Sequence, residues 1–381
     1  MSRSTRHNRD SKRLLLQYCE GYLALMREAD IGEILSRQKG GIASLGLGAG
    51  GVSYLFLMDH HLQGGQDSLE QAERWWQRSI EESNSPVAFL EPAASRDLAM
   101  PIRSLLFGGA GLCYLDLLLA ILRGDRERAR RALSCWRSLL SQCAEGQLEL
   151  NAGLAGNLAG AATALALSRE QCLVAFGSEL AARLENCVIL ETGGSVRWPN
   201  THGEGVAHGT AGIMLSFLLW SEASGSLPPW WLKSGIAILL EETLMKPTRL
   251  CALSEHRSFL CGGFAGLCVL AVQAFRLYKE EPFLAAARGA AHLALEFPSK
   301  LPDLCCGRAG AAAACFSLAT IDPDGAWLAR GQELALSCLL CERSTWPVAG
   351  LYGGEAGLAW LALQVRTGAF SGPPGLDLIR A

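Results

Sequence analysis

The amino-acid sequence predicts an all-α protein in which seven inner and seven outer helices close into an α/α toroid. Three observations lead to this prediction. Seven G-x-x-G motifs recur along the 381 residues, a mostly apolar segment follows each of them, and a charged amphipathic segment lies between successive motifs. No segment of useful length alternates apolar and polar residues, as a half-buried strand would.

The G-x-x-G motifs are copies of one repeating unit, with closing glycines 44 to 60 residues apart. A repeat of this period indicates an array of structural units and outranks a domain count based on length. The seven copies are Gly48–Gly51, Gly108–Gly111, Gly153–Gly156, Gly209–Gly212, Gly263–Gly266, Gly307–Gly310 and Gly354–Gly357. We therefore predict one domain over residues 1–381, with a flexible tail at 1–10, the seven-repeat toroid at 11–367 and a C-terminal tail at 368–381.

The segment after each motif predicts an inner helix. Runs such as Leu112–Leu115 and Leu267–Leu270 are apolar throughout, and a helix that is apolar on all sides must be covered on all sides. Glycine at the start of such a helix allows a sharp turn of the backbone and leaves the first N–H groups accessible at one end of the ring.

The segments between the motifs predict outer helices, because their apolar residues recur every three to four positions and leave one charged, solvated face. The clearest examples are Ser11–Ala29, Gly124–Cys143, Gly177–Leu190, Trp230–Met245 and Pro282–Phe297. The basic run Arg126–Arg131 is expected on the solvated face of its helix.

A closed ring explains the end repeats better than an open solenoid does. An open array needs polar capping repeats at its ends. Here the first and last copies are as apolar as the middle ones, which favours closure.

Composition excludes several other classes of protein. Half of the residues are hydrophobic and 19% are charged, which leaves no room for a long disordered region. A net charge of -3, from 34 basic and 37 acidic residues, argues against a nucleic-acid-binding protein. The uncharged stretches Leu150–Ser168 and Ser258–Phe275 begin in glycine turns, so we expect buried helices and no membrane span.

The 14 cysteines are expected to be reduced thiols of a cytoplasmic protein, because Met1–Arg13 lacks the apolar region of a signal peptide. Three of them lie just before two successive G-x-x-G motifs. Cys261 lies two residues before Gly263, whereas Cys305 and Cys306 directly precede Gly307. If adjacent turns meet at the mouth of the ring, these thiols supply the three protein ligands of a catalytic zinc ion and leave one position open.

At these motifs the sequence resembles the lanthionine synthetase C-like cyclases. The family patterns are approximately G-x-A-H-G, then W-C-Y-G-x-x-G, then C-H-G-x-x-G, and here they read Gly205–Gly209, Leu260–Gly266 and Cys305–Gly310. The resemblance covers residues from about Ser11 to Gln364. It implies a toroid that uses Zn²⁺ to add cysteine thiols to dehydroalanine or dehydrobutyrine, which forms the thioether rings of a lanthipeptide.

The resemblance also implies the roles of individual residues. Cys261, Cys305 and Cys306 would bind zinc, and Cys306 stands where the family usually has histidine. Three thiolates give a Zn²⁺ site a net charge of -1, which would keep a bound substrate thiolate nucleophilic.

His208 would be the general acid or base, since thiol addition produces an enolate that needs a proton at its α-carbon. Arg257 matches a family arginine that would stabilise the enolate oxygen. Glu149 stands where the family has aspartate and would either hold His208 or have lost that role. Gly262 replaces a family tyrosine, which affects substrate contacts more than metal binding.

We therefore expect a zinc-dependent lanthionine synthetase that acts on a dehydrated precursor peptide, with leader and core, and works with a separate dehydratase or kinase-type modifying enzyme. Two alternatives remain open. One is a non-catalytic zinc-bearing scaffold that binds peptide or dehydratase. The other is a different enzyme on the same toroid, either a zinc thiol transferase or a glycosidase-like hydrolase, which would need two carboxylates at the mouth.

Overall fold

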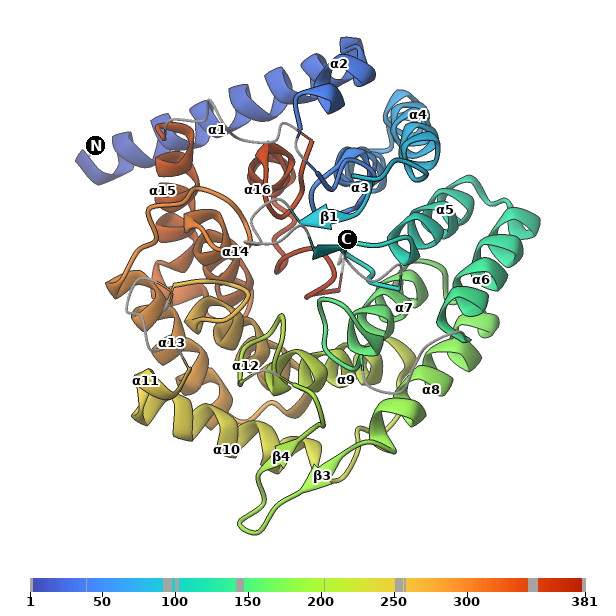
Figure 1. Cartoon of the computed structure of the whole chain (residues 1–381). Helices are drawn as coiled ribbons and strands as arrows, with labels where there is room; N and C mark the ends of the chain where they lie inside the picture. The colour runs from blue at the N-terminus through green and yellow to red at the C-terminus, as the bar shows by residue number, and fades with distance from the viewer. Residues whose placement is uncertain are drawn as a thin grey trace. The chain divides into compact units, whose positions relative to one another are not determined.

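The seven apolar segments form the seven predicted inner helices in the computed structural model of the chain (Figure 1). They are α3 (Ala49–Gln63), α5 (Ala110–Arg123), α7 (Leu154–Ser168), α9 (Thr210–Ser224), α12 (Phe264–Tyr278), α14 (Arg308–Ala319) and α16 (Glu355–Thr367). In α9 every residue from Thr210 to Ser221 is buried, as expected of a helix covered on all sides. The structure describes residues 3–38, 40–91, 98–99, 103–141, 147–201, 203–250, 256, 258–341 and 349–378.

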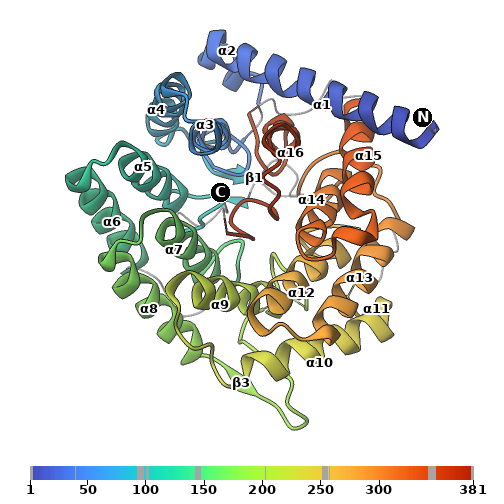
Figure 2. The ribbon, with the colours of Figure 1, turned by 180° about the vertical axis from the view of Figure 1, so that it is seen from behind.

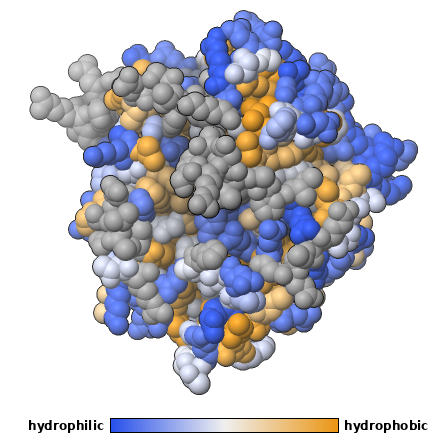
Figure 3. All heavy atoms as spheres, in the orientation of Figure 1, coloured by the Kyte–Doolittle hydropathy of each residue, from blue (hydrophilic) through white to orange (hydrophobic). Residues whose placement is uncertain are grey.

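The amphipathic segments form the seven outer helices. They are α1 (Arg3–Glu28), α4 (Gln66–Glu82), α6 (Arg126–Ser141), α8 (Gln171–Glu185), α10 (Leu232–Met245), α13 (Glu281–Glu296) and α15 (Trp327–Leu339). In α4 the buried side chains Leu69, Ala72 and Trp75 recur every three residues, so only one face is covered. Hydrophilic side chains dominate the upper right and right edge of the face in Figure 3, where Figure 1 places α4 and α6.

The remaining elements are short. They are the helices α2 (Ile31–Ser36), α11 (Pro247–Leu250) and η2 (Pro323–Gly325), and two antiparallel pairs, β1 (Leu90–Glu91) with β2 (Leu98–Ala99) and β3 (Ile189–Leu190) with β4 (Val196–Arg197).

Two predicted helix boundaries were wrong. The outer helix expected over Gly177–Leu190 begins at Gln171 and ends before β3. Gly177 lies inside this helix and does not mark its start. A glycine is needed at this position because the indole ring of Trp220 packs against the helix there, and any Cβ would overlap the ring. The helix expected from Ser11 begins at Arg3, so part of the expected N-terminal tail is helical.

The helices form two compact units, which we describe separately. Unit 1 comprises Met1–Cys143, Ala335–Ala369 and Ala381, and within it α3 packs against α16, α4 and α5. Unit 2 comprises Ala144–Leu334 and Phe370–Arg380, and within it α7, α9, α12 and α14 follow one another as neighbours, with α8, α10 and α13 packed against them (Figure 2).

The glycines of the motifs are required by close packing rather than by an unusual backbone conformation. Six of the first glycines have φ between -114° and -154°, which is extended backbone. A Cβ on the second glycine would overlap the carbonyl oxygen of the residue three positions before the motif, as at Gly212 with Val206 and Gly266 with Leu260. Left-handed glycines occur instead at the C-caps of four inner helices, at Gly64, Gly124, Gly225 and Gly368.

The stretch expected as a C-terminal tail packs into unit 2. Residues 372–378 are buried, and the side chain of Asp377 is fully inaccessible. Asp377 accepts hydrogen bonds from Arg276 Nη1 at 2.7 and 2.8 Å, and also from Gln273 and from Ser317 at 3.3 Å. The carboxylate thus joins the chain end to α12 and α14.

Candidate functional site

Most of the inner helices begin after a tight turn that contains the same backbone hydrogen bond. In five repeats the N–H of the first motif glycine donates to the carbonyl four residues earlier, as from Gly153 to Glu149 and from Gly209 to Gly205, both at 3.0 Å. The side chains immediately before the glycine are therefore carried on equivalent backbones in successive repeats.

Backbone hydrogen bonds connect these turns in series through the residue two positions before the first glycine. In unit 2, Asn151 N–H donates to the carbonyl of Ala207 at 2.9 Å, Ala207 donates to Cys261 at 2.8 Å, and Cys261 donates to Cys305 at 3.3 Å. In unit 1, Tyr352 donates to Gly46 at 2.7 Å, and Gly46 donates to Leu106 at 2.6 Å.

This series places the predicted site residues in register. Cys261 and Cys305 occupy the same position in neighbouring repeats, two residues before the glycine. His208 and Cys306 share the next position, directly before the glycine. Residues from three consecutive repeats are thereby linked through the main chain.

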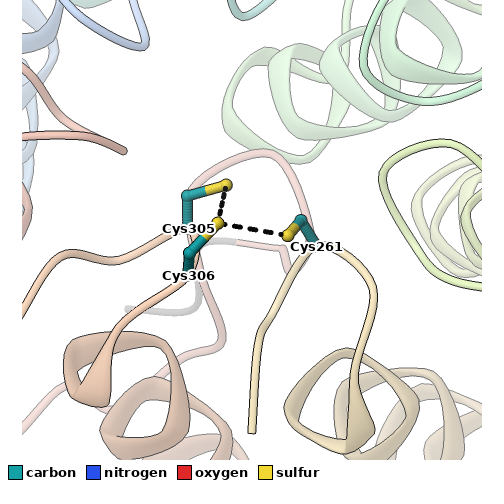
Figure 4. Close-up of side chains that lie close together, drawn as sticks. All are labelled: Cys261, Cys305 and Cys306. Atoms are coloured by element: carbon teal, nitrogen blue, oxygen red, sulfur yellow. Dashed lines mark hydrogen bonds between the residues drawn. The ribbon is translucent and has the colours of Figure 1, made fainter. Parts of the chain in front are cut away.

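The three predicted thiols lie together. Cys261 Sγ is 3.4 Å from Cys306 Sγ, which is 3.5 Å from Cys305 Sγ, and all three sulfurs lie within 4.8 Å of one another (Figure 4). They form the one group of at least three histidine, cysteine or acidic side chains in the described ranges whose ligand atoms are close enough to hold a metal ion.

The thiols influence one another's protonation. Hydrogen bonds from Cys305 and Cys306 lower the pKa of Cys261 well below its ordinary value. The corresponding interaction with Cys261 raises the pKa of Cys305, and it raises the pKa of Cys306 to about 12. The three thiols therefore ionise as a coupled group, and a metal ion must displace the protons that remain on them.

The donor set fits zinc. Three sulfurs at the usual Zn–S distance of about 2.3 Å, in tetrahedral geometry, lie about 3.8 Å apart. The two measured sulfur separations of 3.4 and 3.5 Å differ little from that value. Small side-chain movements would therefore complete the site.

His208 and Glu149, for which the sequence left both a pairing and a lost role open, lie beside each other within unit 2. His208 Nδ1 lies 3.0 Å from Glu149 Oε1, and the Glu149 side chain is 14% exposed whereas that of His208 is 52% exposed. When the proton is on Nδ1 and is donated to the carboxylate, Nε2 is the acceptor nitrogen of the neutral ring. The extra methylene of glutamate reaches His208, so the geometry needed for a supporting role is retained.

The family model of lanthionine synthetase C-like proteins matches residues 41–369. The chain belongs to the lanthionine synthetase C-like family. No curated protein sequence is significantly similar to it.

Among solved structures, nisin cyclase is similar to this lanthionine synthetase C-like chain, with a TM-score of 0.62 and 14% sequence identity over 96% of this chain and 95% of that one. This likeness shows that the fold is the predicted α/α toroid. None of the described helices is long and apolar enough to cross a membrane.

The family resemblance also singled out Arg257 and Gly262, and the structure describes only the second of them. Arg257 lies outside the described residues, so its placement near the thiols stays a prediction. Gly262, at the family's tyrosine position, is described, and a Cβ added there would meet no atom of the described residues within 4 Å. Among the described residues, none therefore fills the space beside Cys261 where the resemblance implies an aromatic ring.

Asp303 lies beside the thiols and was not among the predicted site residues. Its Oδ1 accepts a hydrogen bond from the backbone N–H of Cys306 at 2.6 Å, and burial raises the pKa of its carboxyl group to about 6. A signal was available, because Asp303 lies four residues before its motif glycine, as Ser44, Ser104 and Glu149 do in other repeats.

Proposed function

We propose that this lanthionine synthetase C-like protein is a zinc-dependent lanthipeptide cyclase. It would add cysteine thiols of a dehydrated precursor peptide to dehydroalanine or dehydrobutyrine residues of the same peptide. The observation that carries the proposal is the convergence of Cys261, Cys305 and Cys306 from two successive turns. Membership of the family supports the cyclase assignment.

The three thiolates would hold zinc and leave one coordination position open. Zinc bound there would supply a Lewis acid that keeps the incoming peptide thiol in its thiolate form. Because three thiolates outweigh the charge of Zn²⁺, the site has a net charge of -1. We expect it to retain the nucleophilicity of that fourth thiolate better than a site with two cysteines and one histidine.

The pair formed by His208 and Glu149 would manage the proton. During ring closure a C–S bond forms at the β-carbon of the dehydro residue, its C=C bond is lost, and the α-carbon gains one proton. His208 Nε2 would deliver that proton, while Glu149 fixes the ring through Nδ1 and compensates the charge of the imidazolium. Arg257 would stabilise the enolate oxygen.

The proposed partners follow from this reaction. The substrate is a precursor peptide with leader and core, and a separate dehydratase or kinase-type enzyme would supply its dehydro residues. We place the protein in the cytoplasm because the proposed chemistry needs reduced thiols.

The proposal is tested by incubating the zinc-loaded protein with a dehydrated precursor peptide and counting free thiols by alkylation and mass spectrometry. We expect thiols to be consumed by wild type and by Cys172→Ala, which removes an exposed cysteine on α8. Cys261→Ala should lose both zinc and cyclisation. His208→Asn should keep zinc and cyclise about 10²- to 10⁴-fold more slowly.

The outcomes separate the alternatives. Zinc binding with free thiols that persist as in an enzyme-free control would contradict the cyclase and favour a zinc-bearing scaffold. If an added small thiol is alkylated by the dehydro peptide but no ring forms, the protein is a thiol transferase instead. Full activity of His208→Asn would contradict only the acid–base role.

A further inference from the structure

We infer that Asp303 is a positioning residue that orients Cys306 for metal binding, through its hydrogen bond rather than through its charge. This inference rests on the proposed zinc site. It concerns a residue that contacts the main chain of the ligands and does not itself bind the metal.

The orientation of the peptide group between Cys305 and Cys306 decides where the two thiols point. Side chains of consecutive residues in an extended chain point to opposite sides, so both thiols can face one metal ion only if the peptide between them is held in a turned orientation. Asp303 Oδ1 accepts the N–H of that peptide at 2.6 Å.

The same peptide group is also held at its carbonyl end. The carbonyl of Cys305 accepts hydrogen bonds from Leu260 N–H at 3.0 Å and from Cys261 N–H at 3.3 Å. The peptide is thus held by Asp303 on its N–H side and by the Cys261 turn on its carbonyl side. Its plane, and with it the direction of the Cys306 side chain, is fixed from both sides.

Two other repeats contain the same kind of hydrogen bond. Ser104 Oγ accepts the N–H of Phe107 at 2.9 Å and Ser44 Oγ accepts that of Leu47 at 3.1 Å, from the same position four residues before the motif glycine. The bond therefore recurs in three of these turns, and a neutral hydroxyl suffices for it. Only in the sixth repeat does the bonded N–H belong to a cysteine of the thiol cluster.

The test compares zinc affinities of purified full-length proteins, measured by competition with a chromogenic chelator. We expect Asp303→Ala to bind zinc about 10- to 100-fold more weakly than wild type, the usual effect of removing a partner of a metal ligand. Asp303→Ser and Asp303→Asn keep an acceptor at this position and should bind like wild type. Ser104→Ala removes the equivalent bond in a turn without thiols and should leave zinc affinity unchanged.

A second readout does not depend on affinity. In the cobalt-loaded protein, the near-ultraviolet charge-transfer absorbance per metal reports the number of thiolate ligands. We expect Asp303→Ala to resemble Cys306→Ser, whereas Asp303→Ser should resemble wild type. If Asp303→Ala is not obtained folded, Asp303→Gly replaces it, since Gly205 and Gly350 occupy this position in their repeats.

The outcomes distinguish the two proposals. Absence of zinc binding by the wild type would contradict the proposed function and this inference with it. Equal affinity of wild type and Asp303→Ala, or an equal loss in Ser104→Ala, would overturn the inference alone. Weak binding by Asp303→Ser and Asp303→Asn would show that the carboxylate charge is what matters, which also overturns it.

Discussion

At the residue scale, the inner helices use glycine in two different ways at their two ends. At the start, the motif glycines remove a Cβ that would overlap a neighbouring carbonyl. At the end, Gly64, Gly124, Gly225 and Gly368 adopt a left-handed conformation with φ between 70° and 77°. In α7 this position is taken by Arg169, whose φ is 56°.

The C-cap positions predict opposite effects of opposite substitutions. Gly225→Ala should destabilise the protein by about 1–2 kcal/mol, because an L-residue is strained there while its Cβ meets nothing within 4 Å. Arg169→Gly should stabilise it by about 0.5–1 kcal/mol, since relief of that strain exceeds the entropy cost of glycine. Urea unfolding of both variants measures the effects, and a lower midpoint for Arg169→Gly would contradict this account.

Residues of the candidate site were predictable where a motif fixed their place. The positions of Cys261, Cys305 and Cys306 relative to the motif glycines were sufficient to predict that the thiols meet, and the structure brings them together. Asp303 was not identified, because its importance depends on which peptide N–H it accepts. Pattern reasoning gives the position of a side chain in a repeat but not the direction of the peptide it contacts.

At the element scale, inner helices were better predicted than outer ones. A glycine motif marks the start of each inner helix, whereas the outer helices carry no comparable signal, and α8 begins six residues before the predicted Gly177. The expected solvated run Arg126–Arg131 was also only partly correct. Arg128 is 16% exposed and bonds Glu73 at 2.8 and 2.9 Å and Asp116 at 2.6 Å. These partners lie 55 and 12 residues away, so helix periodicity could not reveal them.

The buried ion pair of the C-terminal stretch gives a prediction at this scale. Asp377→Ala should lower the free energy of unfolding by about 3–5 kcal/mol, because it leaves the Arg276 guanidinium, 8% exposed, without its counter-charge. The matched control is Arg37→Ala, which breaks a pair with Glu33 whose side chains are 72% and 64% exposed and should cost no more than about 0.5 kcal/mol. Similar losses in both variants, measured by urea unfolding, would show that the chain end is not anchored through Asp377.

At the scale of the whole molecule, the fold class was predictable because the repeat is strong and covers nearly the whole chain. Seven inner and seven outer helices are present, and the likeness to nisin cyclase shows the toroid fold. The two short strand pairs were not predicted, since each strand has only two residues and alternation cannot be detected over that length. The prediction of a single domain stays a prediction.

Removal of the metal ion should empty the zinc site but leave the helical fold intact. The fully buried Trp75, Trp136 and Trp198 pack in the helical core without any thiol ligand, and a chain of this size does not need a metal to fold. After chelation, the far-UV circular dichroism at 25 °C should be unchanged. The stability lost should equal the binding term, about 2.7 kcal/mol at a free zinc concentration of 100 times Kd. Loss of the helical signal on chelation would contradict this view.

The hydrogen bonds that connect the turns also indicate how the sequence of such a protein can evolve. Spacing between motif glycines varies from 44 to 60 residues, yet the residues two before the glycine remain bonded in series within each unit. Insertions are therefore accommodated in the connections between helices, while the positions that carry thiol or imidazole keep their mutual register. Chemistry in this architecture can be altered by single substitutions at equivalent sites, independently of the length of the repeats that carry them.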